Sequence, residues 1–349
     1  MMGGKERTSA ERGLRRLTAK SFEQYKDDAS LVPIAAEVIR AGMAGGLPYD
    51  ALTTDVVNGC LSATQICYGN CFAARTAFEA GYDFGVRVRN ILDPDTLRED
   101  LAALPATQGY LRNGWNSDPS WDWEQCLALA EYVAAADRHM VFITKGFRRA
   151  DSGLLEQFAR LKVELRVSIS AFDTPAQLAM RTDLIDSYRN AGGVAIVQLL
   201  SARFVQDELN DKQRDLVDYF LARDFPVSEN SLRFDESSPV LEAIDLSQCG
   251  RVASTGDYWS GRLFTELKVP TLTSVPSRYR GLTSGFLSKN DPDALAKLWR
   301  DPVRTHAEVM TGETYDKPQQ CGVSVSSRPL PRTGKAFPQP KEPDRSTRL

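Results

Sequence analysis

The sequence has no run of about 20 apolar residues, which is the length that a helix needs to cross a bilayer. Basic residues near the start of the chain are not followed by an apolar segment, so no secretory signal is predicted. The chain has 43 Lys and Arg against 46 Asp and Glu, and therefore lacks the basic excess that is typical of duplex-binding domains. We therefore expect a cytoplasmic protein with no membrane partner.

Histidine and cysteine are also scarce, with two His and six Cys among 349 residues. Such a composition is not that of a disulfide scaffold. Three of the cysteines nevertheless lie close together, as Cys60, Cys67 and Cys71 in the pattern C-x6-C-x3-C. In a reducing compartment, a cluster of this kind is more typical of metal binding or catalysis than of a disulfide framework.

Strand and helix patterns alternate along the chain on both sides of this cluster. Apolar strands are expected at 52–57, 109–112, 139–144, 164–170, 194–200 and 231–234. Helices are expected at 33–44, 73–80, 93–104, 152–161, 174–192 and 211–222, with another that ends near residue 136. Apolar rather than alternating strands are typical of parallel sheets that are covered on both faces. The pattern predicts an α/β fold built from βαβ units, as a partial or full (βα) barrel.

The same pattern divides the chain into four parts. Residues 1–28 form a flexible basic arm, and residues 29–235 form the six-unit barrel core. Residues 236–326 form an irregular C-terminal segment that closes the barrel and shapes a substrate pocket, with short helices near 293–299 and 302–310. Residues 327–349 carry several Pro among charges, which predicts a disordered tail.

The cysteine loop follows the first expected strand, and α/β barrels carry their chemistry in such loops. Cys thiolates hold iron–sulfur clusters, and three of them leave one iron of a four-iron cluster without a protein ligand. A structural zinc ion takes four ligands, and the fourth would have to be distant, since His139 and His306 are the only histidines. An iron–sulfur cluster is therefore favoured over zinc or three buried thiols. Of the other cysteines, Cys126 is expected in the core, and Cys249 and Cys321 are isolated.

Over residues 50–235 the chain resembles the radical SAM superfamily. The resemblance begins with the three-cysteine loop after the first strand, and with the aromatic Phe72 beside the last cysteine. The common family spacing is C-x3-C-x2-C, so this chain has a longer variant, and the usual aromatic precedes the last cysteine. The resemblance implies a [4Fe-4S] cluster on the three cysteines and S-adenosylmethionine as a second cofactor.

Further segments resemble cofactor-binding landmarks of the family. Asn113 and Gly114 follow the second strand, where the family has a Gly-rich turn that receives the methionine amino group. Ser168, Ser170 and Arg181 resemble the region that binds the ribose and the carboxylate, and a guanidinium matches a carboxylate in shape. Gln198 is a lone amide in an apolar strand, and a buried amide needs a hydrogen-bond partner, which the cofactor would supply.

The other polar and aromatic residues beside these loops have two interpretations each. Trp115, Trp121 and Trp123 either line a substrate pocket or pack at its rim, and Asp118 caps a helix in the simpler interpretation. Lys145 ends the third strand and is a candidate substrate contact.

The implied function is that of a radical SAM enzyme, in which the cluster reductively cleaves S-adenosylmethionine to a 5′-deoxyadenosyl radical that abstracts hydrogen. The charge balance favours a small metabolite or a biosynthetic intermediate as substrate, and the chemistry requires an external electron donor such as flavodoxin or ferredoxin. Two alternatives stay open. One is radical modification of a peptide or RNA guided by the basic arm, and the other is a zinc-stabilised barrel without radical chemistry.

Overall fold

The computed structural model describes Phe22, Tyr25 and residues 28–42, 52–60, 71–104, 110–234, 238–245, 249–252 and 258–261. The main feature of these residues is a seven-stranded sheet with the strand order β11-β10-β9-β8-β7-β3-β2. Its strands are β2 (Ala41–Gly42), β3 (Leu52–Thr53), β7 (Tyr110–Asn113), β8 (His139–Thr144), β9 (Glu164–Ser170), β10 (Val194–Ser201) and β11 (Val227–Ser231).

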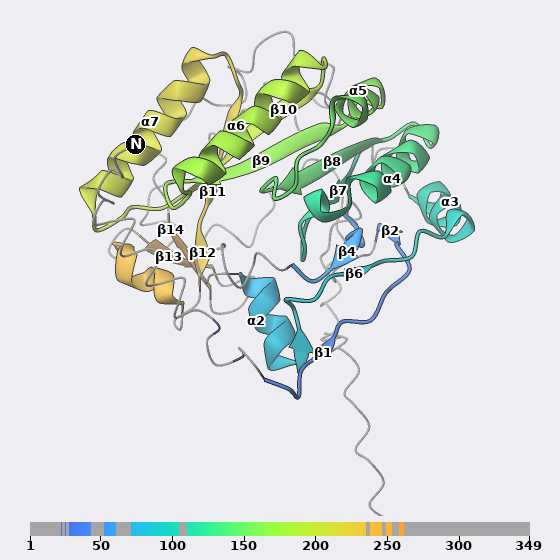
Figure 1. Ribbon diagram of the computed structural model, residues 1–349, viewed down its shortest axis with the longest axis horizontal. Coiled ribbons are helices and arrows are strands. Elements are labelled where there is room, and N and C mark those ends of the chain that lie inside the picture. Colours follow the sequence, from blue (N-terminus) through green and yellow to red (C-terminus); the bar gives the residue numbers. More distant parts are fainter. Residues whose placement is uncertain are drawn as a thin grey trace, which may run out of the picture.

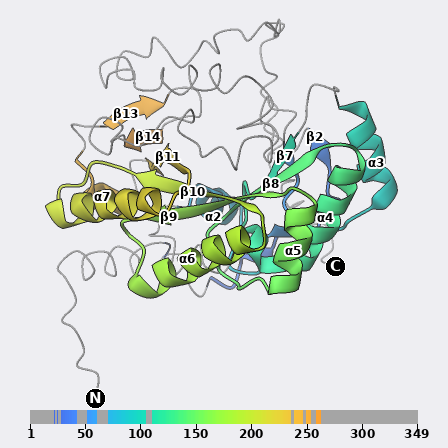
Figure 2. The same cartoon turned by 90° about the horizontal axis from the view of Figure 1, so that it is seen from above.

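Strands β3 to β11 of this sheet are parallel and lie side by side in chain order, and only β2 runs antiparallel to its neighbour. The four later connections each contain one helix: α4 (Trp123–Ala135), α5 (Ser152–Arg160), α6 (Pro175–Asn190) and α7 (Asp207–Ala222). Because parallel crossovers are right-handed, a sequential strand order places these helices on one side of the sheet, as Figures 1 and 2 show. The fold is therefore mixed α/β with a mostly parallel sheet, and β2 and β11 are its edges within the described ranges.

Smaller elements surround the sheet. Within the described ranges, three small sheets join β1 (Val32–Pro33) to β5 (Tyr82–Asp83), β4 (Val57–Asn58) to β6 (Val88–Arg89), and β14 (Tyr258–Gly261) to both β12 (Arg233–Phe234) and β13 (Cys249–Val252). The remaining helices are α2 (Phe72–Glu79), α3 (Pro94–Ala103), and the 3-10 turns η4 (Pro119–Asp122) and η5 (Pro239–Ala243). The helices predicted near 293–299 and 302–310 lie outside the described residues.

The predicted helix at 33–44 is wrong over its described residues, 33–42. These residues form no helix, and their backbone pairs with residues about 50 positions later, through hydrogen bonds such as Ile39 N–H to Ile91 O and Ile91 N–H to Glu37 O. The strand predicted at 52–57 is also divided, because the chain leaves the sheet after β3 and forms β4 with a different partner. The segment predicted as strand at 231–234 contains the end of β11 and, separately, β12.

Helix starts agree with their capping residues. Asp93 accepts a hydrogen bond from Thr96 N–H at 2.8 Å and is followed by Pro at the first helical position of α3. Thr174 and Gln177 form a reciprocal capping box at the start of α6. These local interactions explain why the starts of α3 and α6 could be predicted from sequence.

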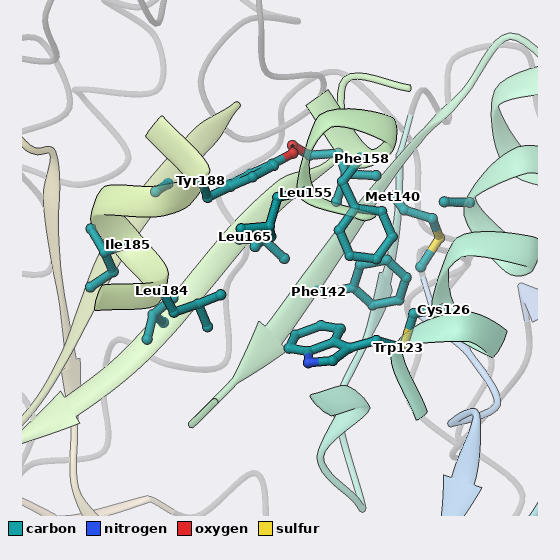
Figure 3. Close-up of a cluster of buried hydrophobic side chains, with 14 of the residues drawn as sticks. Trp123, Cys126, Met140, Phe142, Leu155, Phe158, Leu165, Leu184, Ile185 and Tyr188 are labelled. Carbon is teal, nitrogen blue, oxygen red and sulfur yellow. Dashed lines mark hydrogen bonds between the residues drawn. The ribbon is translucent and has the colours of Figure 1, made fainter. Parts of the chain in front are cut away.

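The core lies between the sheet and the helices that cover one of its faces (Figure 3). Because side chains alternate along a strand, Leu165, Val167 and Ile169 of β9 share this face. They are fully buried in one cluster with residues from the sheet and from α4, α5 and α6, including Phe142, Phe158, Leu129, Val133, Ile185 and Tyr188. Figure 3 shows Phe142 and Phe158 side by side, with their ring planes tilted by 35°, and Tyr188 on α6.

The opposite face of β9 is polar. Its alternate residues Glu164, Arg166, Ser168 and Ser170 are all buried. Glu164 and Arg166 pair with one another at 2.5 Å. Ser168 lies beside Gln198 of β10 in the parallel register, and neither side chain has a hydrogen-bond partner within the described ranges. Buried polar groups without partners are rare, so this face is not built as an ordinary core.

This asymmetry predicts opposite effects for the same substitution at two buried glutamines. Gln198 is 8% exposed and unpartnered, so Gln198→Leu is expected to raise the free energy of unfolding by about 1 kcal/mol. Gln213 is 0% exposed, and its amide bonds both Ala202 N–H and Ala202 O, at 3.1 and 2.9 Å. Gln213→Leu leaves both backbone groups of Ala202 without a hydrogen-bond partner and is expected to lower the free energy of unfolding by about 2–3 kcal/mol. Urea denaturation of both variants tests this, and an equal loss in the two would contradict it.

Candidate functional site

Two of the three clustered cysteines lie among the described residues, and they pack into one apolar cluster. Cys60 lies two residues after β4 and is buried, with its N–H bonded to Phe84 O at 2.7 Å. Cys71 is the N-cap of α2, and its sulfur accepts from Ala74 N–H at 3.5 Å. Both contact the cluster around Ala73, Ala74, Ala77 and Phe78, and neither forms a disulfide. Cys67 lies outside the described residues.

Polar groups approach both sulfur atoms. Trp121 donates its indole N–H to the Cys60 sulfur at 3.1 Å. Burial raises the pKa of the Cys71 thiol, while the amides of Ala74 and Ala73 and the charge of Lys145 oppose that shift. For Cys71 burial is the larger effect, so the pKa of its thiol is raised overall. Within the described ranges, no set of three or more His, Cys, Asp or Glu side chains is placed to hold a metal ion.

The loop after β7 is wrapped around a buried carboxylate, that of Asp55, which lies between β3 and β4. Four successive backbone N–H groups donate to it, those of Gly114 (2.8 Å), Trp115 (3.0 Å), Asn116 (2.6 Å) and Ser117 (2.7 Å). Burial raises the pKa of Asp55, and the four amides act in the opposite direction. This carboxylate therefore fixes the path of the loop through all four of its amides.

The same loop contacts the cysteine segment. Ser117 donates its hydroxyl to Gly59 O at 2.7 Å, directly before Cys60. Trp115 meets Phe72 edge to face at 5.9 Å, and Phe72 is 41% exposed. Residues next to two cysteines are thus tied to the loop after β7.

Glycine is required at two positions of this region. Gly59 has φ +77°, and a Cβ there would lie 2.0 Å from Val86 O. Gly114 has φ +95°, and a Cβ there would lie 2.1 Å from Ile143 O. Any side chain would therefore combine backbone strain with a clash against backbone atoms. Close packing between neighbouring loops depends on both glycines.

A second buried carboxylate, that of Asp118, joins the next two loops. Asp118 caps η4 by accepting from Ser120 N–H at 2.9 Å and from the Ser120 hydroxyl at 2.5 Å. It also accepts from the Thr144 hydroxyl at 2.6 Å and from Lys145 N–H at 2.7 Å, at the end of β8. The capping role expected for Asp118 is confirmed, and the bridge to β8 is an addition that sequence did not indicate.

Arg181 continues this series of contacts toward β9. It is buried, forms an ion pair with Asp173, and donates its Nε–H to Lys145 O at 2.8 Å. Asp173 in turn accepts Ser170 N–H at 2.9 Å, and the Ser170 hydroxyl accepts Phe172 N–H at 3.1 Å. Arg181 and Ser170 therefore contact the loops themselves, and the cofactor contact expected for both stays a prediction.

Three further predicted residues, Asn113, Ser168 and Gln198, lie on the strands of the sheet. Asn113 is buried and donates to Thr53 Oγ1 at 2.9 Å and to Thr54 O at 3.0 Å, which joins β3 to β7, while its Oδ1 has no partner. Ser168 and Gln198 lie on the polar face of the sheet. The structure thus groups Phe72 and Gly114 with the cysteines, and gives Ser168 and Gln198 open hydrogen-bonding capacity.

Sequence reasoning missed Asp55, although a signal was present. An acidic residue within the apolar stretch 52–57 contradicts a simple buried strand, because a buried charge needs partners. Its four partners are backbone amides 59 to 62 positions later, which no local pattern reveals.

No protein-family model and no curated protein matches the chain. Among the described residues, no helix combines the length and the apolar character needed to cross a membrane.

The carboxylate of Asp55 is expected to be hard to replace even by its isostere. Asp55→Asn leaves one oxygen for four N–H donors and turns two further N–H groups toward them, so a loss of about 3 kcal/mol or more in unfolding free energy is expected. Asp93→Asn is the matched control, because Asp93 caps α3, where Asn serves as well as Asp. Thermal or urea unfolding compares the two, and equal stability of both variants would contradict the assigned role of Asp55.

Proposed function

We propose that this protein is a radical SAM enzyme. It binds a [4Fe-4S] cluster through Cys60, Cys67 and Cys71, binds S-adenosylmethionine at the same end of a partial (βα) barrel, and acts on a small metabolite or biosynthetic intermediate. An external donor such as flavodoxin or ferredoxin supplies the electron.

The observation that carries the proposal is the position of the cysteines relative to the loop after β7. Cys60 and Cys71 pack into one cluster, and Ser117 and Trp115 tie the residues beside them to the four-amide loop around Asp55. In α/β proteins with parallel strands, chemistry is found at the carboxyl ends of the strands, where this contact lies. The sequential strand order with helices on one side is also that of a (βα) barrel.

The residues present fit an iron–sulfur cluster. Thiolates are the ligands that such clusters require, and neither described cysteine is used in a disulfide. Hydrogen bonds to ligand sulfur are common around these clusters, and the Trp121 N–H and the Ala74 N–H supply one to each described sulfur. Both described sulfurs therefore receive an N–H donor, as the ligand sulfurs of such clusters do.

When bound, the cluster and S-adenosylmethionine together supply an electron and a 5′-deoxyadenosyl radical that abstracts hydrogen from the substrate. The chain's own residues bind and orient the reactants. Asn113 and Gly114 lie in the loop assigned to the methionine group, and the Asn113 Oδ1 still needs a donor. Ser168 and Gln198 offer hydroxyl and amide groups to the nucleoside or the substrate. Arg181 and Asp173 hold the loops after β8 and β9 at a fixed separation.

The polar face of the sheet supports this assignment. Ser168 and Gln198 are 5% and 8% exposed, and an ordinary core would carry apolar residues at such positions. Functional sites are where proteins depart from such rules. Both side chains are available to a bound polar ligand.

The first prediction for this function concerns metal content. After anaerobic reconstitution with iron and sulfide, the protein is expected to hold about four irons per chain. With dithionite and S-adenosylmethionine it should release 5′-deoxyadenosine slowly. Both properties should be lost when Cys60, Cys67 and Cys71 are changed together to Ala, and iron and nucleoside analysis measures them.

Cys126→Ala is the control for that experiment. Cys126 is fully buried, its thiol donates to Pro119 O at 3.3 Å, and it packs in a different cluster from Cys60 and Cys71. This variant should keep both iron and activity. Zinc in place of iron, or iron that persists in the triple variant, would contradict the proposed function and favour a zinc-stabilised barrel.

A second prediction separates binding from stability at Gln198. Gln198→Leu is expected to weaken S-adenosylmethionine binding to the cluster-loaded protein by about tenfold, the equivalent of one hydrogen bond of about 1.4 kcal/mol, without loss of iron. Equilibrium dialysis with labelled cofactor measures the affinity. Unchanged affinity for S-adenosylmethionine in both Gln198→Leu and Ser168→Ala would contradict the proposal that the polar face of the sheet binds the cofactor.

A further inference from the structure

Several described residues hold Trp121 in place. Its ring stacks on Phe147, with the centroids 5.5 Å apart and the planes 16° from parallel. Its backbone carbonyl accepts a hydrogen bond from the Arg148 guanidinium at 2.9 Å. It lies within η4, whose start is capped by Asp118. The direction of the indole is therefore fixed by the fold, before any metal is bound.

The indole N–H of Trp121 is directed at the Cys60 sulfur. The distance between Nε1 and Sγ is 3.1 Å, short for a hydrogen bond to sulfur. Indole has one donor and no acceptor, so the sulfur can only be the acceptor in this contact. An N–H dipole in this direction stabilises negative charge on the sulfur, and most strongly when that charge is largest.

A cation covers the other side of the indole. The Arg87 guanidinium lies 4.3 Å from the centre of the Trp121 ring. A cation at this distance is attracted by the ring and polarises it, which makes the N–H a stronger donor. Arg87 is exposed, so salt screens the effect of its charge. The hydrogen bond from the Trp121 N–H to the Cys60 sulfur is part-buried, so salt screens it much less.

We propose that Trp121 is a positioning residue that raises the reduction potential of the cluster by donating to the Cys60 sulfur, and that Arg87 strengthens this effect. The inference rests on the proposed function, because it concerns a cluster bound at Cys60. The added electron of the reduced cluster increases the negative charge on its sulfur ligands, so a fixed N–H donor stabilises the reduced form more than the oxidised form. Removing the donor therefore makes reduction harder.

The experiment is a redox titration of the reconstituted, full-length protein, followed by the electron paramagnetic resonance signal of the reduced cluster. Trp121→Phe keeps a ring against Phe147 but removes the N–H. At a fixed potential near the midpoint, it is expected to lower the ratio of reduced to oxidised cluster about tenfold, which equals ~59 mV for a one-electron couple.

Two further variants test whether that shift in potential comes from the hydrogen bond to sulfur. Trp123→Phe is the matched control, because Trp123 lies two residues away but donates its N–H to Arg148 O at 3.0 Å instead of to sulfur, so its midpoint should be unchanged. Arg87→Gln should produce a smaller shift in the same direction, and only at low salt. If Phe at position 121 prevents loading, Trp121→benzothienylalanine retains the shape of the ring without the N–H.

The resonance Raman spectrum provides a second measurement that packing alone would not change. Loss of the hydrogen bond strengthens the iron–thiolate bond, so a stretching band should move to higher frequency in Trp121→Phe and not in Trp123→Phe. A normal cluster with an unchanged potential and unchanged bands in the Trp121 variants would overturn the inference alone. A wild-type protein that binds no iron–sulfur cluster would instead overturn the proposed function.

Discussion

The site depends on buried carboxylates that bind the loops at the carboxyl edge of the sheet. Asp55 accepts four consecutive amides of the loop after β7, and Asp118 connects that loop with the end of β8. Hydrogen bonds to a charged acceptor are about twice as strong as neutral ones. Irregular backbone has no strand partner to satisfy its N–H groups, and a carboxylate supplies the acceptors that the sheet no longer provides. Loop positions are therefore set by two side chains rather than by the sheet itself.

The two faces of the sheet perform different tasks. Leu165, Val167 and Ile169 pack against the helices and supply the apolar burial that stabilises the domain. The side chains of Ser168 and Gln198 on the opposite face form no hydrogen bonds with other described residues. Strand β9 thus serves the core with every second residue, while its alternate residues are polar. This division is available to a parallel sheet whose helices all lie on one side.

Much of the fold could be predicted from sequence because its signals are local. The bounds of β8 and β9 follow from short apolar runs, and the starts of α3 and α6 follow from Asp93 and Thr174 as caps. The segment at 33–42 could not be predicted, since its extended form comes from backbone pairing with residues near 82–91. Tertiary pairing overrode the local pattern there.

The cysteine cluster of the candidate site could be recognised from sequence, but its surroundings could not. Cysteine spacing is visible in a sequence, whereas the partners of a buried charge are not. Arg181 shows this most clearly: its expected contact was a carboxylate, and the structure supplies one from the chain itself, Asp173. A residue type can predict the chemistry of a contact, but the identity of the partner depends on which loops the fold brings together.

The two buried carboxylates determine the surroundings of the Cys60 sulfur. Asp118 fixes η4, η4 carries Trp121, and Trp121 directs its N–H at the Cys60 sulfur. Asp55 fixes the loop whose Ser117 binds the carbonyl directly before Cys60. The sulfur is thus positioned by one carboxylate through the backbone and by the other through an indole. A change at either carboxylate would alter the surroundings of the sulfur without touching it, because both act through groups that are otherwise rigid.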